Sequence, residues 1–265
     1  MPAMPKPQDG DVEAAVPAPA TVAAGKAGPD QAAAEAAKPA GRKVAEEEDP
    51  RLRWAFVRKV YAILALQFAL TAAVSVAACL VRAVPRFFAT GPAAAVWPVF
   101  IGILVSPLIV MFPMLKYREK HPTNLVLLGV FTLCCSLSIA MTTSTSLGRV
   151  VLQAAILTAV AVLGLTLFTF WAVKKGYDFT FMFPFLFTCL NVLLVYLVIQ
   201  IFFPVGRVGI TIYGFLATLV FSGFIIFDTH MLLKRHTYNE YVVAAISLYL
   251  DVINLFMAQM SLSLQ

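Results

Sequence analysis

Two aspartates lie inside strongly apolar runs near the C-terminal end of the sequence: Asp228 in GFIIFDTH and Asp251 in SLYLDVINLF. An ionised carboxylate at the centre of a membrane helix disfavours insertion by about 2.5 to 3.5 kcal/mol, so it normally faces a protein interior or a water path and has a partner. No Lys or Arg lies in the central part of either run. The simplest partner of each aspartate is therefore the other.

Two neighbouring carboxylates would form a proton-sensitive site. In a medium of low dielectric both cannot easily ionise, so the pair is expected to share a proton. Such a pair can act as a pH-responsive switch, or as a weak site that holds calcium transiently at Asp228 and Asp251. Ser247 and Asn254 lie at i−4 and i+3 from Asp251, on the same side of a helix, and are expected to support its carboxylate. No resident cofactor is predicted, because calcium would be the transported ion.

An alternative interpretation gives the two aspartates a purely structural role. Asp228 would then reach the membrane interface, and Asp251 would hydrogen-bond within its own helix and with a neighbour. A metal site at His230 is not expected, because residues two apart on a helix do not share a face.

The composition indicates an integral membrane protein. Of 265 residues, 60% are hydrophobic and only 13% are charged, and the mean hydropathy is +0.84. The basic residues lie in short loops between apolar runs, so the sequence predicts contact with a lipid bilayer and no binding of nucleic acid. A span needs about 20 apolar residues. Runs of that length predict an all-α fold with seven transmembrane helices, at 56–81, 93–115, 124–145, 150–173, 179–203, 208–233 and 241–262.

The loop charges predict the orientation of these spans. Basic residues on one side of the predicted membrane are Arg51, Arg53, Arg58, Lys59, Lys116, Arg118, Lys120, Lys174, Lys175, Lys234 and Arg235. Those on the other side are Arg82, Arg86, Arg149 and Arg207. The positive-inside rule therefore places the N-terminus in the cytosol. Residues 1–50 are rich in Ala and Pro and are expected to be a disordered cytosolic tail, and 51–265 are expected to form the membrane domain.

The last two spans are consecutive and antiparallel, joined by the short loop from Lys234 to Glu240. At 1.5 Å per residue, Asp228 lies roughly 9 Å from Lys234 along its helix, whereas Asp251 lies roughly 17 Å from Glu240. Upright helices would leave the two carboxylates about one and a half turns apart. Their pairing therefore requires a tilt between the helices or a late start to the last one.

The segment FDTHMLLKRHTYNEYVVAAISLYLDVINLF closely resembles the C-terminal signature of the Bax inhibitor family, also called the Lifeguard or transmembrane Bax-inhibitor-motif family. The segment resembles especially the plant Lifeguard members of this family. The resemblance extends through LRWAFVRKVYAILALQF, HPTNLVLLGVFT, LTLFTFWAVKKGYDF and PFLF, and it covers roughly 51 to 260.

This resemblance implies a seven-helix bundle whose last helix is central, with Asp228 and Asp251 as the pH sensor of a calcium-leak pathway. It also implies suppression of programmed cell death from the endoplasmic reticulum or another endomembrane. Bacterial relatives have an arginine near the inner end of the second helix that latches the aspartate pair. The matching region here is MLKYREKHP. The candidates for a gate or latch are Lys116, Arg118, Arg235 and His236.

Two other functions are alternatives to a calcium leak. Intramembrane aspartyl proteases also place two aspartates on adjacent helices, but their GxGD and PAL motifs are absent here, so no enzyme is predicted. The other alternative is a non-conducting membrane scaffold that restrains cell-death or stress signalling through contacts with regulatory proteins. In that case the aspartates would serve only folding.

Overall fold

The computed structural model describes residues 50–118, 120–203 and 206–263. These residues form eight α-helices and one short 3-10 helix, η1. Their order is α3 (Pro50–Leu80), α4 (Ala83–Thr90), α5 (Ala93–Lys116), α6 (Thr123–Ser144), α7 (Gly148–Lys174), α8 (Met182–Phe202), α9 (Gly206–Lys234), η1 (Tyr238–Glu240) and α10 (Tyr241–Ser263). The predicted tail lies outside the described residues, apart from Pro50.

Seven of these helices are long and apolar enough to cross a membrane, which confirms the predicted all-α fold with seven spans. The first helix begins at Pro50, six residues before the predicted start of the apolar run. Proline is favoured in the first turn of a helix, where its missing N–H has no intrahelical partner to lose. The short helix α4 was not predicted, because eight residues give too little periodicity to separate a helix from a loop.

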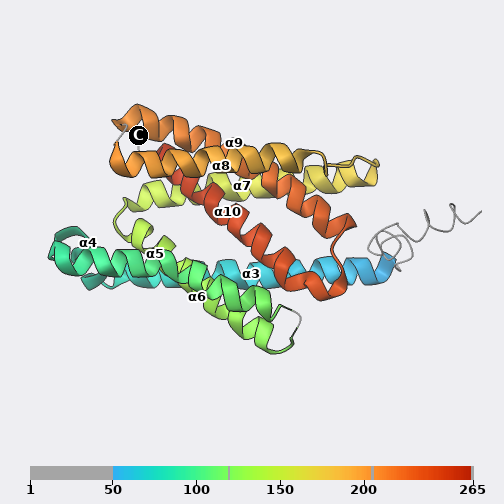
Figure 1. The fold of residues 1–265 in the computed structure, drawn as a ribbon, viewed down its shortest axis with the longest axis horizontal. Coiled ribbons are helices and arrows are strands. Elements are labelled where there is room, and N and C mark those ends of the chain that lie inside the picture. The colour runs from blue at the N-terminus through green and yellow to red at the C-terminus, as the bar shows by residue number, and fades with distance from the viewer. Residues whose placement is uncertain (1–49, 119, 204–205, 264–265) are drawn as a thin grey trace, which may run out of the picture. The chain divides into compact units, whose positions relative to one another are not determined.

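The spanning helices pack as two groups joined by α10 (Figure 1). Helices α5 and α3 both pack on α6, whereas α7 and α8 both pack on α9. Helix α10 crosses obliquely between the groups and packs against α3, α6, α7 and α9. More than half of the residues in the most apolar 18-residue stretch of α10 are buried, which is the largest share among the seven spans. Its place at the centre of the bundle stays a prediction.

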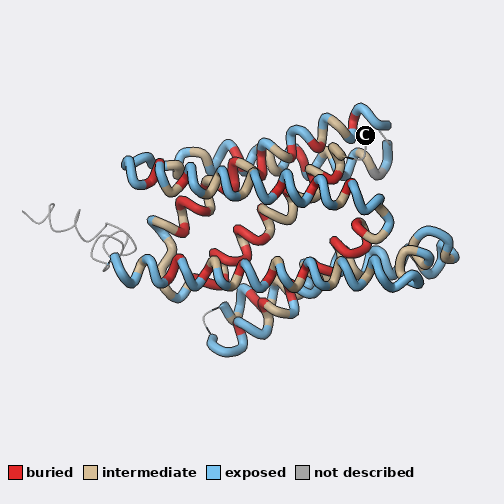
Figure 2. Tube along the Cα trace, turned by 180° about the vertical axis from the view of Figure 1, so that it is seen from behind, coloured by how far each residue is buried: buried red, intermediate tan, exposed pale blue. Residues whose placement is uncertain are grey.

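Exposed residues run along the outer sides of the bundle (Figure 2), and many of them are large and apolar. Leu66, Phe112 and Leu167, for example, are each at least 70% exposed. Exposing such a continuous apolar surface to water would be unfavourable, whereas contact with lipid tails is favourable. The buried residues face the interior and form two clusters, and α10 contributes to both.

Helices α9 and α10 approach closely at Gly214. A Cβ at this position would lie 3.2 Å from the carbonyl oxygen of Ala258 on α10 and 3.1 Å from Leu262. A small residue at a crossing lets two membrane helices pack backbone to backbone. This contact fixes the crossing of the two helices that carry the aspartates.

Candidate functional site

The structure brings Asp228 and Asp251 together between α9 and α10. Their side chains hydrogen-bond with each other, which requires that one carboxyl group carry a proton and donate it to the other. Asp251 is 7% exposed, and Asp228 is partly buried beside it. The oblique course of α10 across α9 provides the tilt that the sequence requires for this pairing.

One oxygen of this pair has no protein donor. The Oδ2 atom of Asp251 is buried and accepts no hydrogen bond from the described residues. No ion pair between two described residues includes either aspartate. A buried carboxylate oxygen of this kind can bind a proton, a water molecule or a cation. The pair therefore has the chemistry of a proton-sensitive or weak cation site.

The predicted supporting residues lie on α10 near the pair. Ser247 is partly buried one helical turn before Asp251. Asn254 lies almost one turn after Asp251, and its Nδ2 donates to the carbonyl oxygen of Leu250 at 2.8 Å. The amide of Asn254 thus bonds along its own helix. Support of the Asp251 carboxylate by these two side chains stays a prediction.

A cavity of about 500 Å³ reaches the turn of α10 that carries Asp251. It lies between α5, α6, α8, α9 and α10, and both Leu250 and Asn254 line it. Besides Asn254, the polar residues that line it are Ser138, Thr142, Tyr213 and Ser261. These residues lie in the half of the bundle remote from the N-terminal end of α3. We call this space the polar cavity because of these side chains; it reaches the turn of Asp251, although neither aspartate lines it.

The basic latch candidates at the end of α5 do not bond to the pair. Lys116 is exposed and places its ammonium group 5.8 Å from the centre of the Tyr117 ring. The carbonyl oxygen of Arg118 accepts a hydrogen bond of 3.0 Å from Asn124. Within the described part of the chain, neither side chain forms a hydrogen bond or ion pair with Asp228 or Asp251. A latch at these residues stays a prediction.

The comparison with known proteins places this geometry in a family. The family described as "Inhibitor of apoptosis-promoting Bax1" matches residues 53–262. The chain belongs to this Bax inhibitor family. It is 52% identical over 216 residues to "Protein LIFEGUARD 4" of Arabidopsis thaliana, covering 81% of this chain and 86% of the relative. The resemblance seen in the sequence is thereby confirmed.

More distant relatives also match most of the chain. The chain is 40% identical to "Protein lifeguard 4" of Mus musculus over 206 residues, 78% of this chain and 83% of the relative. It is 38% identical to the "Golgi anti-apoptotic protein" of Vaccinia virus (strain Lister) over 208 residues, again 78% of this chain and 83% of the relative. In each case the match spans most of both chains.

In this member of the Bax inhibitor family, Arg53 holds the turn between α9 and α10. Its Nε donates to the carbonyl oxygen of Leu233 at 3.0 Å, and its Nη1 donates to that of His236. The side chain thus satisfies carbonyls at the end of α9 that have no partner within the helix. Burial lowers the pKa of His236, although the Glu240 carboxylate 3.4 Å away opposes this.

We expect Arg53→Gln to destabilise the folded protein by roughly 2 kcal/mol, because hydrogen bonds to charged groups contribute about 1.5 to 3 kcal/mol each. The melting temperature of the purified protein in detergent measures this effect. Arg58→Gln is the matched control, because Arg58 is an exposed arginine of the same helix. Equal melting temperatures for the two variants would contradict the role of Arg53.

A second polar cluster joins the α7–α8 loop to the end of α9. Nε2 of the buried His230 lies 3.5 Å from Oδ1 of Asp178, and Nη2 of Arg235 lies 3.9 Å from Oδ2. Thr180 donates to Oδ1 of Asp178 from its hydroxyl at 2.5 Å and from its backbone N–H at 2.8 Å. Sequence reasoning missed this cluster, because Asp178 and His230 are far apart in the chain.

Hydrogen bonds from Thr180 lower the pKa of Asp178, and the charges of His230 and Arg235 lower it further. A depressed carboxyl pKa stabilises the folded loop above the ordinary Asp value, and this contribution is lost as the pH falls through the depressed pKa. At neutral pH, the backbone amides of this loop should therefore exchange hydrogen more slowly in the wild-type protein than in Asp178→Asn. The difference between the two proteins should vanish in acid. A difference that persisted at low pH would rule out the carboxylate as its cause.

Proposed function

We propose that this chain is a pH-sensitive calcium-leak channel of an intracellular membrane, which regulates calcium homeostasis and suppresses programmed cell death. The observation that carries the proposal is the buried, hydrogen-bonded pair of Asp228 and Asp251, which has no basic partner among the described residues. Intramembrane acids of this kind mark ion pathways and proton relays. The polar cavity that reaches the Asp251 turn supports a route for ions.

The proposed gate follows from the protonation of the pair. With one shared proton, the two carboxyl groups attract each other and hold α9 against α10. Loss of that proton leaves two negative charges in a medium of low dielectric, which repel each other and favour a cation between them. Deprotonation would then shift the equilibrium between a closed and an open arrangement by a few kcal/mol.

The names of relatives support the cell-death part of the proposal. One relative is named an anti-apoptotic protein and is assigned by that name to the Golgi. We therefore propose an endomembrane location, in the endoplasmic reticulum or a neighbouring compartment. The bias of basic residues at span ends supports a cytosolic N-terminus. No catalytic role is proposed.

A non-conducting scaffold is the second candidate function. The names of these relatives refer to cell death or to Lifeguard, and none of them refers to ion transport. A scaffold would act through contacts with cell-death or stress regulators, and the aspartates would then only hold α9 and α10 together.

Calcium flux from liposomes that hold the purified full chain distinguishes the two functions. We expect flux above that of protein-free liposomes, with a rate that changes from about pH 5 to about pH 8. Flux at the protein-free level across the whole series would reject the channel and favour the scaffold. Flux without pH dependence would reject the proposed gate.

A further inference from the structure

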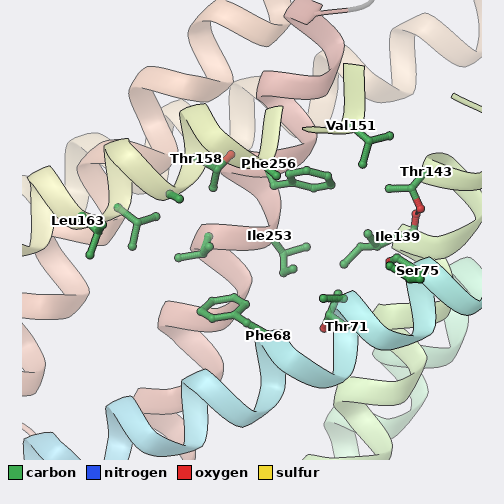
Figure 3. Close-up of a pocket in the computed structure, with 16 residues that line it drawn as sticks. Phe68, Thr71, Ser75, Ile139, Thr143, Val151, Thr158, Leu163, Ile253 and Phe256 are labelled. Carbon is green, nitrogen blue, oxygen red and sulfur yellow. The ribbon is translucent and has the colours of Figure 1, made fainter. Parts of the chain in front are cut away.

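A second cavity lies next to the polar cavity, and Ile139 and Ile253 line both. It has a volume of about 580 Å³ and is enclosed by α3, α6, α7 and α10. Figure 3 shows Phe68 and Thr71 of α3 facing Ile253 and Phe256 of α10 across this space. Its volume falls within the range of about 300 to 1,000 Å³ that is typical of small-molecule sites.

The lining of this cavity is apolar and carries no charged residue. Apart from four residues with hydroxyl groups, the lining consists of alkyl and aromatic side chains such as Phe68, Ile253 and Phe256. Two of its four hydroxyl groups are already bonded: Thr71 bonds with Tyr249 and Ser136, and Thr143 donates to Ile139. Among the residues that line this cavity, Ser75 and Thr158 have buried hydroxyls that form no hydrogen bond with the described residues.

Water is a poor occupant for such a space. Each buried water needs two to four polar partners, and a water takes up about 30 Å³ of liquid volume. Two hydroxyls cannot satisfy the many waters that would fill about 580 Å³. An empty cavity of this size is also unfavourable, because its lining loses van der Waals contacts. An apolar occupant resolves both problems.

The cavity opens toward the lipid between α3 and α7. Helix α3 packs on α6 and α10, and α7 packs on α9 and α10, but α3 and α7 do not pack extensively on each other in the described chain. At this gap Val76 is 57% exposed and Leu163 is 64% exposed. Because both helices span the membrane, what reaches this opening is the acyl region of the bilayer.

One end of this cavity lies near a membrane surface. Ser75 precedes the end of α3 by five residues, roughly 8 Å, and Val151 follows the start of α7 by three residues, roughly 5 Å. Two exposed arginines lie near these ends: Arg82 follows α3 by two residues, and Arg149 lies in the first turn of α7. Their side chains suit the phosphate of a lipid headgroup. A chain that enters here could leave its phosphate at the surface.

We infer that this cavity binds one acyl chain of a membrane phospholipid, which enters from the bilayer between α3 and α7. The occupant is uncharged along its buried length, as the lining requires, and its headgroup stays at the surface beside the two arginines. Ile139 and Ile253 line both this cavity and the polar one, so the bound chain would also support the wall of the polar cavity.

Fluorescence quenching by brominated phosphatidylcholine tests this site in the full-length protein. In a background with Trp54, Trp97 and Trp171 changed to Phe, Phe256→Trp places a reporter in the cavity. A second reporter, Val160→Trp, faces the lipid and serves as the reference. Because pockets of this kind enclose most of a ligand, we expect the fraction of fluorescence that acyl-chain bromine quenches at Phe256→Trp to be within a factor of about two of the fraction at Val160→Trp. Acrylamide, which is dissolved in water, should quench it little.

A matched pair of substitutions separates a bound chain from ordinary boundary lipid. Ala72 lines the cavity, whereas the equally exposed Ala73 does not. We expect Ala72→Leu to reduce bromine quenching of the Phe256→Trp reporter, and Ala73→Leu to leave it unchanged.

Three results would overturn the inference. Quenching by acrylamide alone would mean a water-filled cavity, and quenching by neither agent would mean an empty one. Bromine quenching that Ala72→Leu does not reduce would mean boundary lipid only. Phe68→Trp, which reports from α3 on the same cavity, replaces Phe256→Trp if that variant does not fold.

Discussion

Asp251→Asn is expected to abolish the pH dependence of calcium flux through the reconstituted protein. Asparagine has nearly the same shape and can still donate a hydrogen bond to Asp228, so α9 and α10 remain in contact. It cannot release a proton, however, and a single remaining carboxylate has no like charge beside it. In this variant, the ratio of the flux at about pH 8 to the flux at about pH 5 should be close to one.

Asp228→Asn should have nearly the same effect, because interacting carboxyl groups titrate as one unit. For the same reason the double variant should be no more severe than either single variant. Asp251→Glu is the conservative control, which keeps a titratable group and should retain a pH-dependent profile with a displaced midpoint. A normal pH profile in either asparagine variant would show that the two aspartates do not form the sensor.

The aspartate pair could be predicted because its signal is local in the sequence. A single acidic residue in a long apolar run is visible without any structure, and two such runs in succession must be antiparallel neighbours. Their vertical offset could not be resolved from helix rise alone. The oblique crossing of α10 over α9, with the close approach at Gly214, depends on how side chains pack in three dimensions.

The spans were predictable from hydropathy, but their ends and the polar contacts around them were not. Helix α3 continues to Pro50 through charged residues that lie beyond the apolar run. The cluster of Asp178 and His230 joins a loop to a helix that is distant in sequence, so no periodicity indicates it. The two cavities are spaces left by the packing of four or more helices, and no residue pattern specifies such a space.

Ser261→Phe is expected to reduce calcium flux about tenfold at the pH where wild-type flux is greatest, because an apolar constriction removes water and with it the ions. Ser261 lies near the end of α10 and lines the polar cavity that reaches Asn254 and Leu250. The added ring would close this route well away from the aspartates. The pH dependence of the remaining flux should therefore be unchanged, which separates a blocked route from a damaged sensor.

Ser263→Phe is the matched control, because Ser263 is also a partly buried serine of α10 and does not line the cavity. Both variants should elute and melt like the wild-type protein in detergent, so that any loss of flux is not a loss of fold. If Ser261→Phe conducted as well as Ser263→Phe, calcium would not pass through the polar cavity. The aspartates would then have to be reached by a path outside this cavity.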